Sequence, residues 1–361
     1  MLRRRLLVAA AAMLSASLFG LGRDSARAAA LGHLPPRLGD QEFWTLVADL
    51  SEPGGTFRSD NLLSNESRLQ LVIPDLLQAV KPGGVYVGVG PEQNFTYIAA
   101  LQPSMAFIVD IRRGNLQLHL LYKALFELSA DRADFVSRLF SRKAPDNLDA
   151  SSSASDIFDA YSRVDPSDEL YDRNLKAIET LLAGGHGFAL SNDDIKGIAY
   201  VYHAFYTFGP GINYSSSESA SAGGGYRPTY ADLMVATDGD GNARSYLASE
   251  DAFRTVKSLH RNNLIVPVVG DFAGSKAVRA IGTYLKQKDA VVSTFYVSNV
   301  EQYLRLERVW GSFCANVARL PLDGASVFIR AGRGGRYSRG TALTAELSPI
   351  GVEVEGCELR P

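Results

Sequence analysis

The chain contains little cysteine and lacks the short motifs of the commonest hydrolytic and metal chemistries. Its only cysteines are Cys314 and Cys357, with no Cys-x-x-Cys pair and no Cys/His cluster at zinc spacing. There is no Gly-x-Ser-x-Gly elbow, Walker loop or His-Glu-x-x-His motif, so hydrolase, NTPase and zinc-protease functions have no support. The two cysteines either pair in an oxidising compartment or stay as free thiols, and the sequence leaves both alternatives open.

The chain also lacks a strong excess of charge of either sign. It carries 37 Lys and Arg against 39 Asp and Glu, and no basic patch with interleaved aromatic residues is evident. A nucleic-acid partner is therefore not expected. With 46% hydrophobic and 21% charged residues, the composition is typical of a soluble globular protein, long enough for one large domain or two small ones.

A long apolar run occurs at the start of the chain. Arg3, Arg4 and Arg5 precede the segment LLVAAAAMLSASLFGLG, and small residues follow around Ala26 to Ala29. This pattern predicts a secretory signal peptide over residues 1–29, hence a periplasmic or secreted protein without a membrane span after cleavage. Two alternatives remain: an uncleaved anchor, or a start at Met13 or later, which would leave the protein in the cytoplasm.

The segment GGVYVGVGPEQNFTYIAALQPSMAFIVDIRR, residues 83–113, predicts a strand, a glycine turn, a helix and a second strand. Gly88 and Gly90 would let a ligand approach the backbone, because a side chain there would block it. Asp110 ends the second strand about 20 residues further on, where a carboxylate can accept hydrogen bonds from both ribose hydroxyls. We therefore expect a nucleoside-containing small molecule at the carboxyl edge of a parallel sheet. The alternative is a βαβ unit whose glycines only make a tight turn.

The third glycine of the dinucleotide-binding motif is missing. Glu92 and Gln93 stand where it would fall. A carboxylate there would repel a pyrophosphate at the helix N-terminus, so a ligand with a ribose and no phosphate fits better. Glu92 is itself expected to be one of the residues that bind this ligand.

Beyond this unit, strand and helix patterns alternate again after a long interruption. Further strands are expected to end at Asp271 and at Ser298–Asn299, a hairpin is expected over residues 233–249, and a last edge strand over 351–359. The fold class is therefore α/β, a Rossmann-like, mainly parallel open sheet with helices on both faces and a largely helical insertion. The expected parts are a signal peptide, an N-terminal linker with helices, the sheet domain and the inserted cap: residues 1–29, 30–82, 83–130 with 251–361, and 131–250.

This order of elements resembles the class I S-adenosylmethionine-dependent methyltransferases over residues 83–128 and 260–330. GVGPEQNF is similar to their first motif, and the resemblance implies that Asp110 holds the ribose of S-adenosylmethionine. It also implies that Asp271, in GDFAG, flanks the adenine, and that Asn299, in FYVSN, faces the methyl donor and acceptor. The combination of NLIVPVVGDFAG and FYVSNVEQYL also resembles a group of uncharacterised bacterial proteins with a methyltransferase-like fold.

The sequence departs from that family at several positions. Tyr86 stands where an acid is common, the third glycine is absent, and no Asp/Asn-Pro-Pro-Tyr follows FYV, so methylation of the amino group of a base is not indicated. Two functions remain open. One is a methyltransferase with an unknown acceptor; the other is an exported, non-catalytic protein that binds a small molecule or an envelope partner.

Two further groups of residues are candidates for binding the substrate. Asp60, Asn61 and Asn65 lie, together with Ser64 and Glu66, in a polar loop before the first strand. This loop could fold over the ligand; alternatively, its residues form turns and helix caps. Tyr206 belongs to an aromatic helix that could exclude water and hold a sulfonium by cation–π contact. The alternative for that helix is an apolar face that docks the insertion on the sheet. No metal site is expected.

Overall fold

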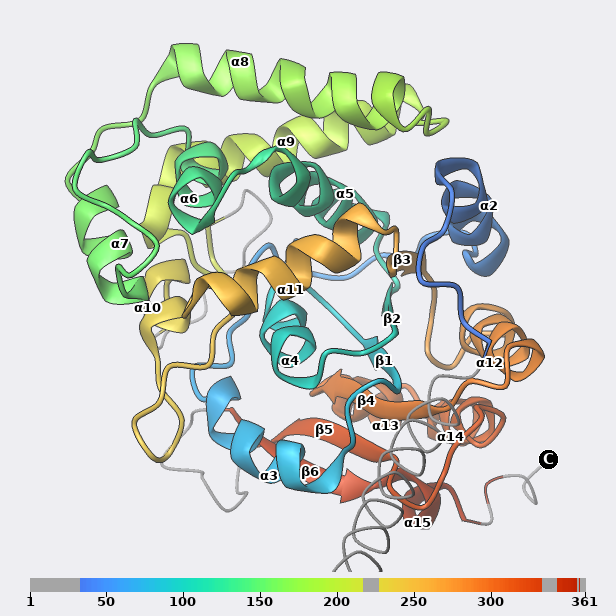
Figure 1. Ribbon diagram of the computed structural model, residues 1–361. Coiled ribbons are helices and arrows are strands. Elements are labelled where there is room, and N and C mark those ends of the chain that lie inside the picture. The colour runs from blue at the N-terminus through green and yellow to red at the C-terminus, as the bar shows by residue number, and fades with distance from the viewer. Residues whose placement is uncertain (1–32, 217–226, 333–342, 356, 358–361) are drawn as a thin grey trace, which may run out of the picture.

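The computed structural model describes residues 33–216, 227–332, 343–355 and Cys357, so the expected signal peptide lies outside the described residues. At its centre is one six-stranded sheet in the order β3-β2-β1-β4-β5-β6 (Figure 1). The strands are β1 (Val85–Gly88), β2 (Met105–Asp110), β3 (Ile265–Val269), β4 (Val292–Ser298), β5 (Val327–Gly332) and β6 (Thr344–Pro349). The expected α/β fold with a mainly parallel open sheet is confirmed.

The first three parallel strands are short, largely apolar runs that are buried on both faces. Every residue of β1, β2 and β3 is buried, as expected for strands covered by helices on both sides. Only β6 runs antiparallel to its neighbour, β5. The predicted edge strand at 351–359 is wrong, because residues 344–349 already pair with β5 and the next residues form the short helix α15 (Ile350–Val354).

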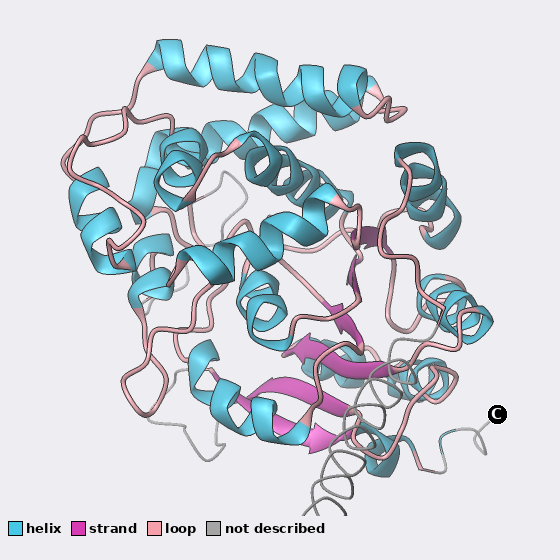
Figure 2. Ribbon diagram, viewed as in Figure 1, coloured by secondary structure: helices cyan, strands magenta, loops and turns pink. Residues whose placement is uncertain are grey.

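Helices cover both faces of the sheet (Figure 2). One face carries α4, α5 and α11, and the other carries α12, α13 and α14. Their bounds are α4 (Gln93–Leu101), α5 (Arg113–Leu128), α11 (Glu250–Arg261), α12 (Ala277–Gln287), α13 (Val300–Leu306) and α14 (Trp310–Val317). Within the described residues, the α-helices that precede the sheet are α2 (Asp40–Leu50), which contacts β3 and α12, and α3 (Ile73–Ala79), which contacts α4.

The segment between α5 and α11 forms a further helical layer outside α5, with α8 and α9 outermost in Figure 1. Its helices are α6 (Arg132–Phe140), α7 (Ala154–Tyr161), α8 (Asp168–Glu179), α9 (Asn192–Phe208) and α10 (Tyr230–Val235). An ion pair between the buried Asp194 and the half-exposed Arg113 fastens α9 to α5, since Asp194 accepts two hydrogen bonds of 2.7 Å from Arg113. Burial opposes ionisation of Asp194, but hydrogen bonds from Arg113 and Ser191 outweigh it and lower the pKa to about 2.

The hairpin expected over residues 233–249 is not formed. Residues 233–235 are the last turn of α10, and the only pairing beyond it is the single bridge between Thr237 and Ala243. The turn between them is closed by Asp238, whose carboxylate accepts backbone hydrogen bonds from Asp240 and Asn242. The helix forms because the Thr229 hydroxyl accepts a hydrogen bond from the Asp232 N–H and so caps the first turn. The apolar sequence LMVAT predicts a strand when this cap is not recognised.

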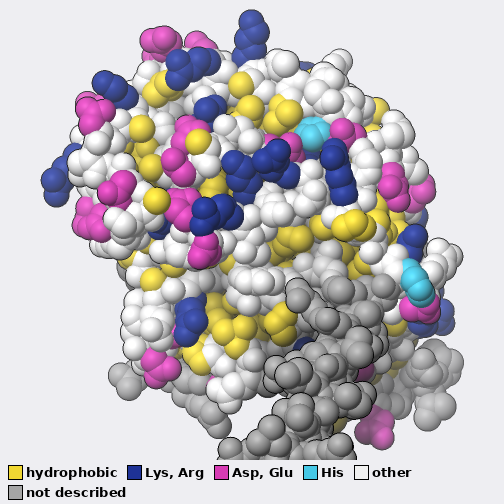
Figure 3. Space-filling view, viewed as in Figure 1, with side chains coloured by type: hydrophobic (Ala, Val, Ile, Leu, Met, Phe, Trp, Pro, Cys, Tyr) yellow, Lys and Arg dark blue, Asp and Glu magenta, His cyan; other side chains and the backbone are white. Residues whose placement is uncertain are grey.

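On the face shown in Figure 3, basic and acidic side chains are interspersed, with hydrophobic side chains between them. This mixture agrees with the small net charge of −2. Over residues 33–216, 227–332 and 343–355, none of the helices combines the length and the apolarity needed to cross a bilayer.

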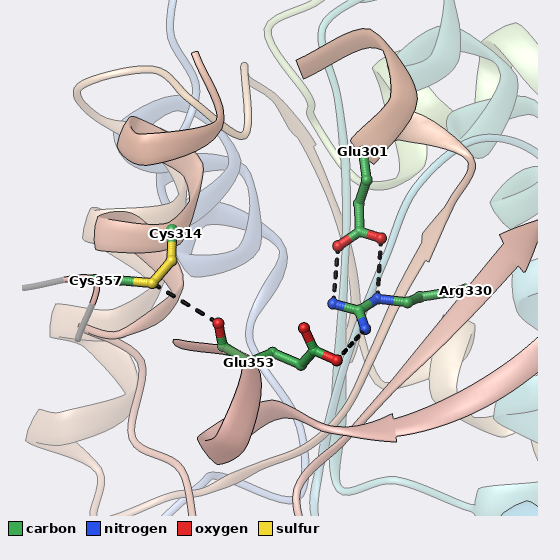
Figure 4. Close-up of a disulfide and its surroundings, with 5 residues drawn as sticks. All are labelled: Glu301, Cys314, Arg330, Glu353 and Cys357. Atoms are coloured by element: carbon green, nitrogen blue, oxygen red, sulfur yellow. Dashed lines mark hydrogen bonds and ion pairs between the residues drawn. A yellow bond between two sulfur atoms is a disulfide. The ribbon is translucent and has the colours of Figure 1, made fainter. Parts of the chain in front are cut away.

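The C-terminal elements are fastened to the sheet by a disulfide and by ion pairs (Figure 4). Cys314 of α14 is bonded to Cys357 across 43 residues of sequence, with the Cα atoms 5.6 Å apart. Arg330 of β5 pairs with Glu301 of α13 at 2.9 Å and with Glu353 of α15 at 2.7 Å. The structure thus shows the two cysteines paired in a disulfide. The ion pair between Arg330 and Glu301 anchors α13, which begins where β4 ends.

Candidate functional site

A cleft lies at the carboxyl edge of the parallel strands. Gly90, Asp110, Asp271 and Asn299 line it, each placed at or just after the end of a different strand. The space between its walls is about 1040 Å³, part of it open to solvent. Because the chain crosses from β3 back to β4, beside β1, this edge is a topological switch point, where open α/β sheets bind ligands. Asn61 and Asn65 of the preceding loop also line the cleft.

The two glycines of the first strand–helix turn differ in what they face. Gly90 has φ +78°, and an added Cβ would meet the side chains of Gln93 at 3.2 Å and Asn61 at 3.6 Å, both of which line the cleft. At Gly88, an added Cβ would come within 2.7 Å of the Tyr86 ring and still closer to the Asn94 amide oxygen. The expectation for Gly88 is therefore corrected. It makes room for the buried hydrogen bond from Tyr86 to Asn94, not for a ligand.

Alanine at each glycine separates these two roles. We expect Gly88→Ala to lower the free energy of unfolding by about 1–3 kcal/mol, because it overpacks a buried hydrogen-bonded pair. Gly90→Ala also costs about 1 kcal/mol because of its positive φ, but its main effect is a methyl group in the cleft. Urea unfolding followed by circular dichroism measures both costs, and an unchanged midpoint for Gly88→Ala would contradict the packing role.

The carboxylate of Asp110 is held by Arg112. Oδ1 accepts from the backbone N–H and from Nε of Arg112, both at 2.9 Å, and Oδ2 accepts from Nη2 at 2.6 Å. Only one acceptor position, on Oδ2, is left. The expectation that Asp110 grips both ribose hydroxyls is therefore corrected to one hydroxyl while Arg112 stays in place. Arg112 also donates to the carbonyl of Asp60, which ties the loop before β1 to this edge.

Glu66 belongs to the polar loop expected to cover the ligand, and it lines the cleft. Its side chain is 1% exposed, and Oε1 accepts hydrogen bonds from the Tyr296 hydroxyl at 2.6 Å and from the Ser298 hydroxyl. Burial raises the pKa of this carboxyl, although the two hydroxyl donors lower it in part. Glu66 stands beside Asn65 in the polar loop, but it differs from its neighbours in bonding to Tyr296, which lies 230 residues further along the chain. A local sequence pattern cannot predict a contact between residues so far apart.

The aromatic wall of the cleft comes from the loop and α13, not from α9. Phe57 and Tyr303 meet edge to face with ring centroids 5.3 Å apart, and both line the cleft, as does Tyr214. Tyr206, the predicted aromatic residue, lies elsewhere and donates its hydroxyl to Asp168 of α8. The helix α9 packs against α5 and α8, so Tyr202 and Phe205 are buried in the core and Tyr206 contacts α8, away from the cleft.

One comparison with known proteins gives a match. The family described as "Domain of unknown function (DUF7790)" matches residues 62–179 and 225–346. The chain belongs to this family. The matched segments contain β1 to β5 and include Glu66, Gln93 and Asp110 of the cleft, whereas Phe57 and Asn61 precede them. No curated protein matches the chain.

Two other predicted site residues in or near the family segments do not reach the cleft. Glu92 is fully buried, its carboxylate accepts the Ser64 N–H at 3.3 Å, and burial raises its pKa to about 8. The carboxylate of Asp60 accepts the Tyr200 hydroxyl at 2.8 Å on the side of α9. Both expectations are corrected, because each carboxylate is engaged by a neighbour away from the cleft.

Proposed function

We propose that the cleft binds S-adenosylmethionine and that the protein transfers its methyl group to a small-molecule acceptor. The observation that carries this proposal is the charge of the cleft. Among the residues that the structure describes, the acidic side chains lining it are Glu66, Asp110, Asp271 and Glu307, and the basic one is Arg112, which is already paired with Asp110. An acidic cleft favours a cation such as a sulfonium and disfavours a phosphate.

The remaining walls suit a nucleoside. Oδ2 of Asp110 can accept one ribose hydroxyl, and the glycine at position 90 allows close approach to the backbone. Phe57 and Tyr303 provide an aromatic surface against which a purine can pack. S-adenosylmethionine supplies an activated methyl group, and the chain's part is to hold donor and acceptor in line and to keep water out.

A second candidate is the non-catalytic binding protein, and two observations favour it. Arg112 occupies most of the acceptor positions of Asp110, the carboxylate expected to bind the ribose. The disulfide between Cys314 and Cys357 is typical of oxidising compartments, which agrees with the proposed export of the protein.

Calorimetry tests the proposed function. We expect S-adenosylmethionine and S-adenosylhomocysteine to bind with micromolar dissociation constants, and ATP not to bind. Gly90→Ala should weaken binding about tenfold or more, equal to about 1.4 kcal/mol. Gly114→Ala, at an exposed position with nothing within 4 Å, is the matched control and should leave binding unchanged.

The outcomes separate the two candidates. Transfer of a labelled methyl group to any small acceptor supports the methyltransferase. Tight binding without transfer to amine, hydroxyl or thiol acceptors supports the non-catalytic protein. The absence of heat at millimolar S-adenosylmethionine and S-adenosylhomocysteine rejects this ligand for both.

A further inference from the structure

Two buried acceptor atoms in the wall of the cleft have no hydrogen-bond partner among the described residues. They are Oε2 of Glu66 and Oε1 of Gln93, on side chains that are 1% and 3% exposed. Both residues line the cleft. Buried polar atoms are almost always hydrogen-bonded, so two such acceptors beside one cleft indicate donors that come from a ligand.

Internal hydrogen bonds join the two residues into one unit. The Tyr296 hydroxyl donates to Oε1 of Glu66 at 2.6 Å and accepts from Nε2 of Gln93 at 3.1 Å. Nε2 of Gln93 also lies 3.3 Å from the Val89 carbonyl, and the Ser298 hydroxyl donates to Glu66. Since these donors are used within the protein, the unit offers the cleft only acceptors.

An acceptor-only site with a carboxylate suits a protonated primary amine. An ammonium group has three N–H donors and a positive charge, whereas a hydroxyl has one donor and no charge. The donors that reach Glu66 are the neutral hydroxyls of Tyr296 and Ser298, so a cationic ligand would supply the missing counter-charge.

We propose that Glu66 and Gln93 form a subsite for a primary amine, and that this amine is the methyl acceptor. The assignment to the acceptor rests on the proposed function. It follows from position, because Glu66 is held by Tyr296 and Ser298 of β4, whereas Asp110 and Asp271 follow β2 and β3 on the other side of β1.

The subsite also supplies the proton acceptor that such a reaction needs. The ammonium N–H passes its proton to Oε2 of Glu66, which frees the nitrogen lone pair. A nitrogen–methyl bond then forms as the sulfur–methyl bond breaks, its electron pair stays on sulfur, and the products are a secondary ammonium and a thioether. Burial makes the Glu66 carboxylate a stronger base than an exposed one.

The test uses methylammonium, the smallest primary ammonium, and compares it with tetramethylammonium, which has the same charge and no N–H. At equal ionic strength and saturating S-adenosylhomocysteine, methylammonium should raise the melting temperature of the wild-type protein by about 2 °C or more. Tetramethylammonium should give less than a quarter of that rise. Glu66→Gln should abolish the methylammonium effect, whereas Glu169→Gln, at an exposed position on α8 outside the cleft, should keep it in full.

Gln93→Met, which removes the other free acceptor and leaves Glu66 unchanged, provides a second variant should Glu66→Gln not fold. It should reduce the methylammonium effect by half or more. Equal effects of the two ions, or a full effect in both Glu66→Gln and Gln93→Met, would overturn the amine subsite. Competition between methylammonium and S-adenosylhomocysteine would overturn the acceptor assignment. The subsite would then bind the amino group of the methyl donor, S-adenosylmethionine, and not that of the acceptor. A methylammonium effect without any binding of S-adenosylhomocysteine would retain the amine subsite and reject the cofactor.

Discussion

Replacing Arg112 by leucine should lower the free energy of unfolding by about 3 kcal/mol. Arg112 and Asp110 are only 10% and 6% exposed, and three hydrogen bonds join them. Removal of the guanidinium leaves a nearly buried carboxylate without its counter-charge and the Asp60 carbonyl without its donor. Breaking a buried pair by removing one partner typically costs 3–5 kcal/mol, and we expect the low end of that range because the pair faces an open cleft.

Urea unfolding measures this cost, and a double-mutant cycle with Asp110→Asn assigns it to the pair. The double variant Asp110→Asn/Arg112→Leu should lose less stability than the two single losses added together, because it leaves no buried charge unpaired. Arg173→Leu, at an exposed position on α8, is the matched control and should change stability by less than about 0.5 kcal/mol. A loss below about 1 kcal/mol in Arg112→Leu would show that Asp110 does not depend on this partner and is free to bind a ligand.

Reducing the disulfide between Cys314 and Cys357 should lower the free energy of unfolding by roughly 4 kcal/mol. The bond closes a loop of 43 residues that contains β5, β6 and α15. A cross-link of this length restricts the unfolded chain strongly, and it holds Cys357 against α14 in the folded state. Arg330 stays paired with Glu301 when the bond is reduced, so we expect the sheet and α13 to remain folded at low temperature.

Urea unfolding with and without a thiol-free reductant measures the effect of the disulfide. The double variant Cys314→Ser/Cys357→Ser serves as the control. Its stability should match that of the reduced wild-type protein and should not respond to the reductant. An unfolding midpoint of the wild-type protein that is the same in both conditions would mean that the two cysteines are not bonded in solution.

The sequence by itself determined the class of fold and the edge of the sheet at which a ligand would bind. Buried apolar runs separated by amphipathic helices predict parallel strands, and the carboxyl ends of parallel strands meet at one edge. Residues far apart in the chain could therefore be placed around one cleft: Gly90 and Asp110 from local patterns, and Asp271 and Asn299 from strand ends together with the family resemblance. This inference succeeds because it needs only the direction of the strands. Strands that alternate with helices along the sequence run parallel, and this alternation can be recognised from local periodicity.

Tertiary structure alone decided what the side chains at that edge do. The same local pattern fits an Asp110 that is free for a ribose and one that is held by Arg112, and it fits a Gly88 that faces a ligand as well as one packed against Tyr86. Glu66 acquires its role only from hydroxyls that lie 230 residues or more further along the chain. The neighbour that the fold brings closest occupies the acceptor positions of a side chain and the space beside it. The spacing of residues along the sequence does not predict which neighbour that is.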